Sequence, residues 1–228
     1  MEEKNTSNSK IAAIIKPRIH HQKKQKLEDV APLKTPFSVH IDVCSLCNFR
    51  CSFCFQADKL GKKEKNFPHG MMKMDLFKKT VDNLKTFPDR IKKIKIGNHG
   101  EPTLHPLLPK FIEYARKSDV ADIIEVFTNG SKLNQKLNKE LVDAGLQRIN
   151  ISLEGLSSER YLKVAAAKIN WDEFVSNVRD LYSYSRKNGD LNIYVKIINH
   201  ASELKGKTVF SMTDEEKDIF YKTFGNIA

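Results

Sequence analysis

The sequence has no cysteine outside one short stretch, because all four of its cysteines fall between residues 44 and 54. A secreted disulfide-bonded domain would spread its cysteines along the chain, so this distribution excludes a disulfide framework and indicates a reducing compartment. Long apolar runs are lacking as well. The run at residues 11–15 is too short for a membrane span or a secretory signal. We therefore predict a cytoplasmic protein with no membrane partner.

A nucleic-acid recognition motif is also lacking, although the formal net charge over 228 residues is +11. The lysines are scattered along the whole chain, and no aromatic residues are interleaved with them in a binding pattern. We expect a solvated lysine-rich surface, with nucleic acid not the main substrate. An RNA-modifying enzyme remains an alternative.

The chain divides into a tail and one domain. Residues 1–35 are polar and basic, with a basic run at residues 20–24, and show no sustained periodicity. Residues 36–228 have a regular pattern and are long enough for one domain with a sizeable core.

Strand and helix patterns alternate strictly through this domain. Apolar, β-branched runs predict strands at residues 37–43, 91–96, 123–127, 148–153 and 191–198. Apolar residues at helical spacing predict helices within residues 74–84, 106–115, 137–145, 170–181 and 213–224. Strict alternation implies an α/β fold with a parallel sheet and right-handed crossovers, either a barrel or an open doubly wound sheet.

Unusual residues follow each predicted strand. They are the cysteine stretch, residues 97–102, residues 128–130, residues 152–155 and, within the fifth strand, Lys196. Active sites of parallel βα folds lie at the C-terminal ends of the strands. We therefore predict that these residues share one site.

Three of the cysteines have the compact spacing Cys-x3-Cys-x2-Cys, at Cys47, Cys51 and Cys54. Three thiolates on a four-iron cube would leave one iron open to an external ligand. The alternative is a zinc site that also uses Cys44. Zinc ribbons usually separate their two cysteine pairs by a dozen or more residues, whereas only three residues lie between Cys47 and Cys51 here. A non-catalytic zinc or iron–sulfur interaction module is the corresponding alternative function.

The polar residues after the later strands have both ordinary and functional interpretations. Gly100 would let the backbone approach a ligand, and Glu101 would add a charge-assisted bond to an ammonium group. Asn129 alone is typical of a turn, and Ser152 alone is typical of a strand end. Lys196 either extends its amine to the barrel mouth or binds an anionic substrate.

Residues 47–54, with Phe53 before the last cysteine, resemble the signature of the radical S-adenosylmethionine enzymes. The stretch Gly100-Glu101-Pro102 is similar to the glycine-glutamate-proline stretch that follows the second strand in this family. Residues 128–130 and 152–155 come in the family's order, so the resemblance covers about residues 37–200.

The resemblance implies a partial (β/α)6 TIM-like barrel, here with about five recognisable strands. It implies a [4Fe–4S] cluster on Cys47, Cys51 and Cys54, whose open iron binds S-adenosylmethionine. With an electron from a reductant such as flavodoxin or ferredoxin, the cluster would cleave this cofactor to a 5′-deoxyadenosyl radical. The radical would abstract hydrogen from an unknown peptide, protein or small molecule.

The resemblance also assigns residues to the S-adenosylmethionine site. Phe53 would contact the adenine, Gly100 and Glu101 the methionyl ammonium, and Ser152 the ribose or carboxylate. Asn129 would belong to the same cofactor-binding set. Cys44 has no ligand role in this assignment.

The sequence departs from the family pattern at three places. His99 stands where the family often has a second glycine, and Glu154 where it often has aspartate. The family barrel also needs a sixth strand after the helix at residues 213–224, and many relatives continue into a SPASM or twitch domain. We therefore expect the domain to be C-terminally incomplete.

Overall fold

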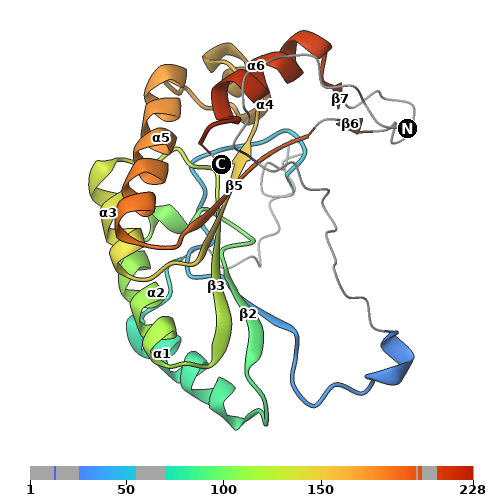
Figure 1. The fold of residues 1–228 in the computed structure, drawn as a ribbon, viewed down its shortest axis with the longest axis vertical. Coiled ribbons are helices and arrows are strands. Elements are labelled where there is room, and N and C mark those ends of the chain that lie inside the picture. The colour runs from blue at the N-terminus through green and yellow to red at the C-terminus, as the bar shows by residue number, and fades with distance from the viewer. Residues whose placement is uncertain (1–12, 14–25, 55–69, 199, 202–209, 228) are drawn as a thin grey trace.

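Figure 1 shows the computed structural model, which describes residues 13, 26–54, 70–198, 200–201 and 210–227. Its main sheet contains β1 (Ser38–Ile41), β2 (Ile91–Ile96), β3 (Ala121–Thr128), β4 (Arg148–Leu153) and β5 (Asn192–Ile197). These are the five predicted strands, and their ends agree with the prediction to within two residues. The prediction of an α/β fold is confirmed.

All five strands are parallel and lie in the order β1-β2-β3-β4-β5. A doubly wound sheet reverses its strand order part-way and has helices on both faces. Here the long helices lie along one face of the sheet (Figure 1). The doubly wound alternative is therefore excluded, and the architecture is that of a partial barrel.

Five of the helices were predicted from their apolar spacing. They are α1 (Met74–Asn83), α2 (Leu108–Lys117), α3 (Gln135–Asp143), α5 (Trp171–Asn188) and α6 (Asp214–Phe224). The predicted capping box of α6 is present: Glu216 N donates to Thr213 Oγ1 at 3.1 Å, and Thr213 N donates to Glu216 Oε2 at 3.0 Å. Gly145 follows α3 with a φ of +81°, as expected for a glycine past a helix end.

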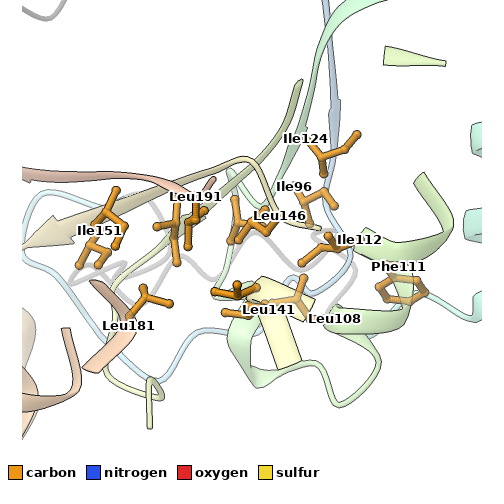
Figure 2. Close-up of a cluster of buried hydrophobic side chains, with 14 of the residues drawn as sticks. Ile96, Leu108, Phe111, Ile112, Ile124, Leu141, Leu146, Ile151, Leu181 and Leu191 are labelled. Carbon is orange, nitrogen blue, oxygen red and sulfur yellow. The ribbon is translucent and has the colours of Figure 1, made fainter. Parts of the chain in front are cut away.

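The core lies between the sheet and these helices (Figure 2). Ile96, Ile124 and Ile151 point from three strands toward the helices and are fully buried. They meet Leu108 and Ile112 of α2, Leu141 of α3 and Leu181 of α5. Burial of each such side chain contributes about 1.5–3 kcal/mol, so this apolar layer is the main source of the fold's stability.

Side chains alternate along each strand, so the sheet has a second face that points away from α1, α2, α3 and α5. We call it the inner face. It carries His40, Lys93, Lys95, Glu125, Phe127, Arg148, Asn150, Ser152, Tyr194 and Lys196. This face is polar and charged where the helix-facing side is apolar.

Two features were not predicted. The helix α4 (Ser158–Ala165) follows β4, and a small antiparallel sheet pairs β6 (His200–Ala201) with β7 (Phe210–Ser211). Three short 3-10 helices complete the described elements: η1 (Leu27–Asp29), η3 (Leu84–Thr86) and η4 (Pro102–Leu104).

Most of the predicted tail lies outside the described residues, including the basic run at residues 20–24, as does most of the basic loop at residues 59–70. The last part of the predicted tail is described and contacts the domain, since Asp89 N donates to Thr35 Oγ1 at 3.2 Å. Among the described helices, none combines the length and apolar character that a membrane span requires.

Candidate iron–sulfur and cofactor site

The cysteine loop leaves the C-terminal end of β1 and packs against α4. Arg50 N and Ser52 N donate to the carbonyls of Ala165 and Val164, both at 2.8 Å. The side chains of Cys51 and Cys54 lie in a small apolar cluster that also contains Phe49 and Tyr161. The unpredicted helix α4 therefore forms one wall of the cysteine loop.

The three cysteines of the predicted ligand set lie within electrostatic range of one another. Burial, followed by the charges of Glu154, Cys47 and Cys54, raises the pKa of Cys51 to about 12. Partial desolvation raises the pKa of Cys47 as well, followed by the charges of Glu101 and Cys54. Mutual repulsion of this kind is what a cationic metal centre relieves when it binds thiolates.

The described residues do not contain three metal-binding side chains gathered tightly enough to hold a single ion. A zinc site needs all its ligands about 2.3 Å from one metal, whereas a four-iron cube binds each thiolate through a different iron.

Cys44 lies apart from these three. It is fully buried in the main core with Val43 and Ile41, not in the apolar cluster around Cys51. Its Sγ donates to Leu46 O at 3.6 Å. Burial is the main cause that raises the pKa of its thiol, and the other cysteines do not contribute. This geometry is that of a core residue.

Glu101 is the most deeply buried charged residue of the site, with 1 % of its surface exposed. Its Oε1 accepts from Thr103 N at 3.0 Å, from Thr103 Oγ1 at 2.5 Å and from Thr128 Oγ1 at 2.6 Å. Its Oε2 accepts from Asn129 N at 2.6 Å. We call these four residues the Glu101 brace. Burial raises the pKa of Glu101, and the four donors oppose that shift.

The brace uses Oε1 of Glu101 fully, because that oxygen accepts three bonds, whereas Oε2 accepts one. The carboxylate joins the loop after β2 to the end of β3. Glu101 therefore fixes the shape of this site.

Asn129 extends the brace to the cysteine loop. Its Nδ2 donates to Asn48 Oδ1 at 3.0 Å and points at Cys47 Sγ, 4.0 Å away. Its Oδ1 accepts from Ser131 N at 3.0 Å and Ser131 Oγ at 2.7 Å. Phe49 N also donates to Cys47 Sγ, at 3.4 Å. The first cysteine of the predicted ligand set is thus contacted by two N–H groups, an arrangement that stabilises a thiolate.

Gly100 is where the loop after β2 touches the cysteine loop. Its φ is +104°, and a Cβ atom there would lie 2.2 Å from Cys44 O and 2.9 Å from the carbonyl carbon of Ser45. Glu101 N donates to Leu46 O at 2.7 Å beside this contact. Only glycine fits at this position, since the conformation and the space both exclude a side chain.

Asp42 is a site residue that was not predicted. Its Oδ1 accepts from Asn98 N at 2.7 Å and His99 N at 3.0 Å, and its Oδ2 lies 2.8 Å from His99 Nδ1. Burial opposes ionisation, but the bonds from His99 and Asn98 lower the pKa of Asp42 overall. An acidic residue directly before the cysteine loop was the only signal for this role in the sequence.

The remaining predicted residues lie around the same edge of the sheet. Phe53 is 57 % exposed. Ser152 lies on the inner face in register with Lys196, whose Nζ is 4.9 Å from the centroid of the Phe127 ring. Glu154 is half-buried near Cys51; burial raises its pKa, and a hydrogen bond from Cys51 opposes the shift.

A protein-family comparison supports the same interpretation. The profile described as "Radical SAM superfamily" matches residues 41–213, which is most of the chain. The chain belongs to the radical SAM superfamily. This family of enzymes uses a [4Fe–4S] cluster and S-adenosylmethionine, so the predicted superfamily and cofactors are confirmed.

The radical SAM chain is also similar to individual proteins. It is 30 % identical over 205 residues to a probable GTP 3′,8-cyclase of Methanococcus maripaludis, covering 79 % of this chain and 65 % of the relative. Its fold resembles Streptococcus suis SuiB, solved with the precursor peptide SuiA (TM-score 0.62, 13 % identity, 86 % of this chain and 38 % of that one). It also resembles anSMEcpe, solved with AdoMet and a peptide (TM-score 0.55, 19 % identity, covering 85 % of this chain and 63 % of that one). The chain thus spans less than two thirds of each of these proteins.

Proposed function

We propose that this chain binds a [4Fe–4S] cluster through Cys47, Cys51 and Cys54 and catalyses radical chemistry with S-adenosylmethionine. The observation that carries the proposal is the Glu101 brace, which connects the ends of β2 and β3 to the loop that presents the three thiols. Such a brace pre-organises the site before any ligand arrives, and pre-organisation is how proteins support cofactor chemistry.

The residues have distinct proposed roles toward the cofactor. Once reduced by a donor such as flavodoxin or ferredoxin, the bound cluster would supply the electron that cleaves S-adenosylmethionine. The exposed ring of Phe53 offers a surface for the adenine. Ser152, half-buried on the inner face, would donate to the ribose or carboxylate. Gly100 and Glu101 would position the backbone that receives the methionyl ammonium, and Asn129 would hold the cysteine loop against it.

The reaction class that we propose is hydrogen abstraction from an organic substrate. The named relatives include a probable GTP 3′,8-cyclase, and the structural neighbours include proteins solved with peptides. A nucleotide and a peptide are therefore the two substrate classes to compare. The predicted cytoplasmic location agrees with the need for a reductant and for reduced thiols.

The test is anaerobic reconstitution with iron and sulfide, followed by reduction in the presence of S-adenosylmethionine. We expect about four iron and four sulfide per chain, an absorbance that bleaches on reduction, and 5′-deoxyadenosine as a product. Cys51→Ala should lose the cluster, whereas Cys44→Ala, the matched control on the core side of the loop, should retain it. One zinc per chain with no sulfide, or equal loss in both variants, would contradict the proposal.

A further inference from the structure

The inner face carries an excess of positive charge in adjacent rows. One row, set by the strand register, consists of His40, Lys95, Glu125 and Arg148. The next contains Phe127, Asn150 and Tyr194, and the row at the rim contains Ser152 and Lys196. Lys93 lies below Lys95 on the same side of β2. Among the described residues of the rows below the rim, Lys93, Lys95 and Arg148 therefore share this face with one carboxylate, that of Glu125.

That carboxylate is already engaged. Glu125 is 4 % exposed, and its Oε1 accepts from Asn150 Nδ2 at 2.6 Å. The same oxygen lies 3.8 Å from Arg148 Nη1, too far for a short ion pair. One negative charge cannot neutralise Lys93, Lys95 and Arg148, so this part of the described inner face has an excess of about two positive charges.

Arg148 shows where an acceptor is missing. Its guanidinium lies 5.0 Å from the centroid of the Tyr194 ring, and its side chain is only 20 % exposed. Its Nε is buried and has no hydrogen-bond acceptor within the part of the chain that the structure describes. A buried donor left unpaired is unfavourable, so an external acceptor at this position would be stabilising.

The lysines lie near this position and are crowded. Burial lowers the pKa of Lys93, and the charges of Arg148 and Lys95 lower it further, against the effect of Glu125. Lys95 and Lys196 approach the same ring, with Nζ atoms 6.0 Å and 4.9 Å from the Phe127 centroid. Cations this close to one another favour a shared anion between them.

We propose that the inner face binds the anionic end of a small-molecule substrate that carries at least two negative charges, with Lys93, Lys95 and Arg148 as its main contacts. The identification of the ligand as a substrate rests on the proposed radical SAM function. The binding of an anion by the inner face does not. Ser152 and Arg148 are four residues apart on β4, which is about 13 Å at the usual strand rise. The rest of the substrate would therefore lie between the anion and the S-adenosylmethionine site at the rim.

Charge balance separates the two substrate classes. A triphosphate ester offers several acceptors and three or more negative charges to a guanidinium and two amines. A peptide with one acidic side chain would leave part of the excess charge unmatched. A tricarboxylate also carries several negative charges, so the two chemistries must be distinguished by experiment.

The experiment is calorimetric titration of the full chain with inorganic triphosphate and, separately, with citrate at one fixed ionic strength. We expect saturable triphosphate binding that weakens at least about tenfold in Lys95→Ala and in Arg148→Met. Lys92→Ala is the matched control, because Lys92 is exposed on the same strand but points away from the inner face. It should change affinity less than about twofold.

The outcomes are distinct. Tighter binding of triphosphate than of citrate supports a phosphorylated substrate, and the reverse supports a polycarboxylate; both uphold the anionic site. No saturable binding of either ion, equal losses in Lys92→Ala and Lys95→Ala, or tighter binding of an acidic peptide overturns it. Iron and sulfide content, measured on the same samples, reports separately whether the proposed cluster forms.

Discussion

The Glu101 brace and the inner face lie on the same strands but satisfy their charges in opposite ways. In the brace, one buried carboxylate receives four hydrogen bonds from neighbouring residues. On the inner face, Arg148 has a buried donor with no described acceptor, and Lys93 is crowded by like charges. A site that must hold its shape satisfies its own polar groups, whereas a site that awaits a ligand leaves part of its bonding capacity open.

The largest loss of stability is expected from Gly100→Ala. This substitution disrupts the contact between the cysteine loop and the loop after β2, beside the Glu101 brace. The added Cβ would lie 2.2 Å from Cys44 O at a φ of +104°. We expect a loss of about 3 kcal/mol or more in unfolding free energy and loss of cluster incorporation. Urea unfolding and iron content measure the two effects. Gly70→Ala is the control, because no atom of the described residues lies within 4 Å of its added Cβ. An equally unstable control would contradict the explanation by the contact with Cys44.

Glu101→Gln tests whether the brace depends on a full carboxylate. The amide nitrogen would face donors and lose the bonds that one oxygen receives, so we expect destabilisation of about 2–3 kcal/mol by urea unfolding. Glu140→Gln on α3, whose side chain is 45 % exposed, should change stability by less than about 0.5 kcal/mol. Equal stability of Glu101→Gln and the unmodified chain would show that the four bonds contribute little.

Glu125→Gln tests whether the positive charge of the inner face determines its affinity for an anion. Removal of its charge increases the positive excess near Lys95 and Arg148, so triphosphate affinity should rise about fivefold. Titration calorimetry measures this, with Glu113→Gln on the exposed side of α2 as the control for net charge. An unchanged affinity, or the same rise in the control, would mean that the inner face does not bind the anion.

The smallest change in stability is expected from Asp42→Asn, and this change depends on pH. The folded-state pKa of Asp42 is lowered from 3.8, so the stability that it contributes is present above that value and is lost as the pH falls through the folded-state pKa. In urea unfolding of the metal-free chain, Asp42→Asn should lose stability near pH 7 and should show a shallower decline below pH 4. If the stability of Asp42→Asn and of the unmodified chain depended on pH in the same way, groups other than Asp42 would cause the loss of stability in acid.

The fold was predictable where a local pattern determines the structure. Buried parallel strands appear as short apolar runs, which is why β2 and β4 were placed without error. The helix α4 was missed because it is short and buries only Tyr161 and Ala165, too few positions to establish a helical period.

The site was predictable as a set of residues but not as a network. Strand-end positions identified Glu101 and Asn129, yet their bonds to each other join segments 28 residues apart. Asp42 acts on a loop 56 residues later in the chain, and no spacing rule connects such pairs. The close approach of Gly100 to the cysteine loop was likewise not predicted, because no local pattern indicates which segment a glycine will contact.

The sequential order of the strands has a consequence for biosynthesis. Each strand pairs with the one made just before it, so the sheet can grow in step with translation. The three thiols are made early, but Thr128 and Asn129, which complete the brace around Glu101, follow about 75 residues after Cys54. The cysteine loop therefore reaches its final shape only once β3 has joined the growing sheet.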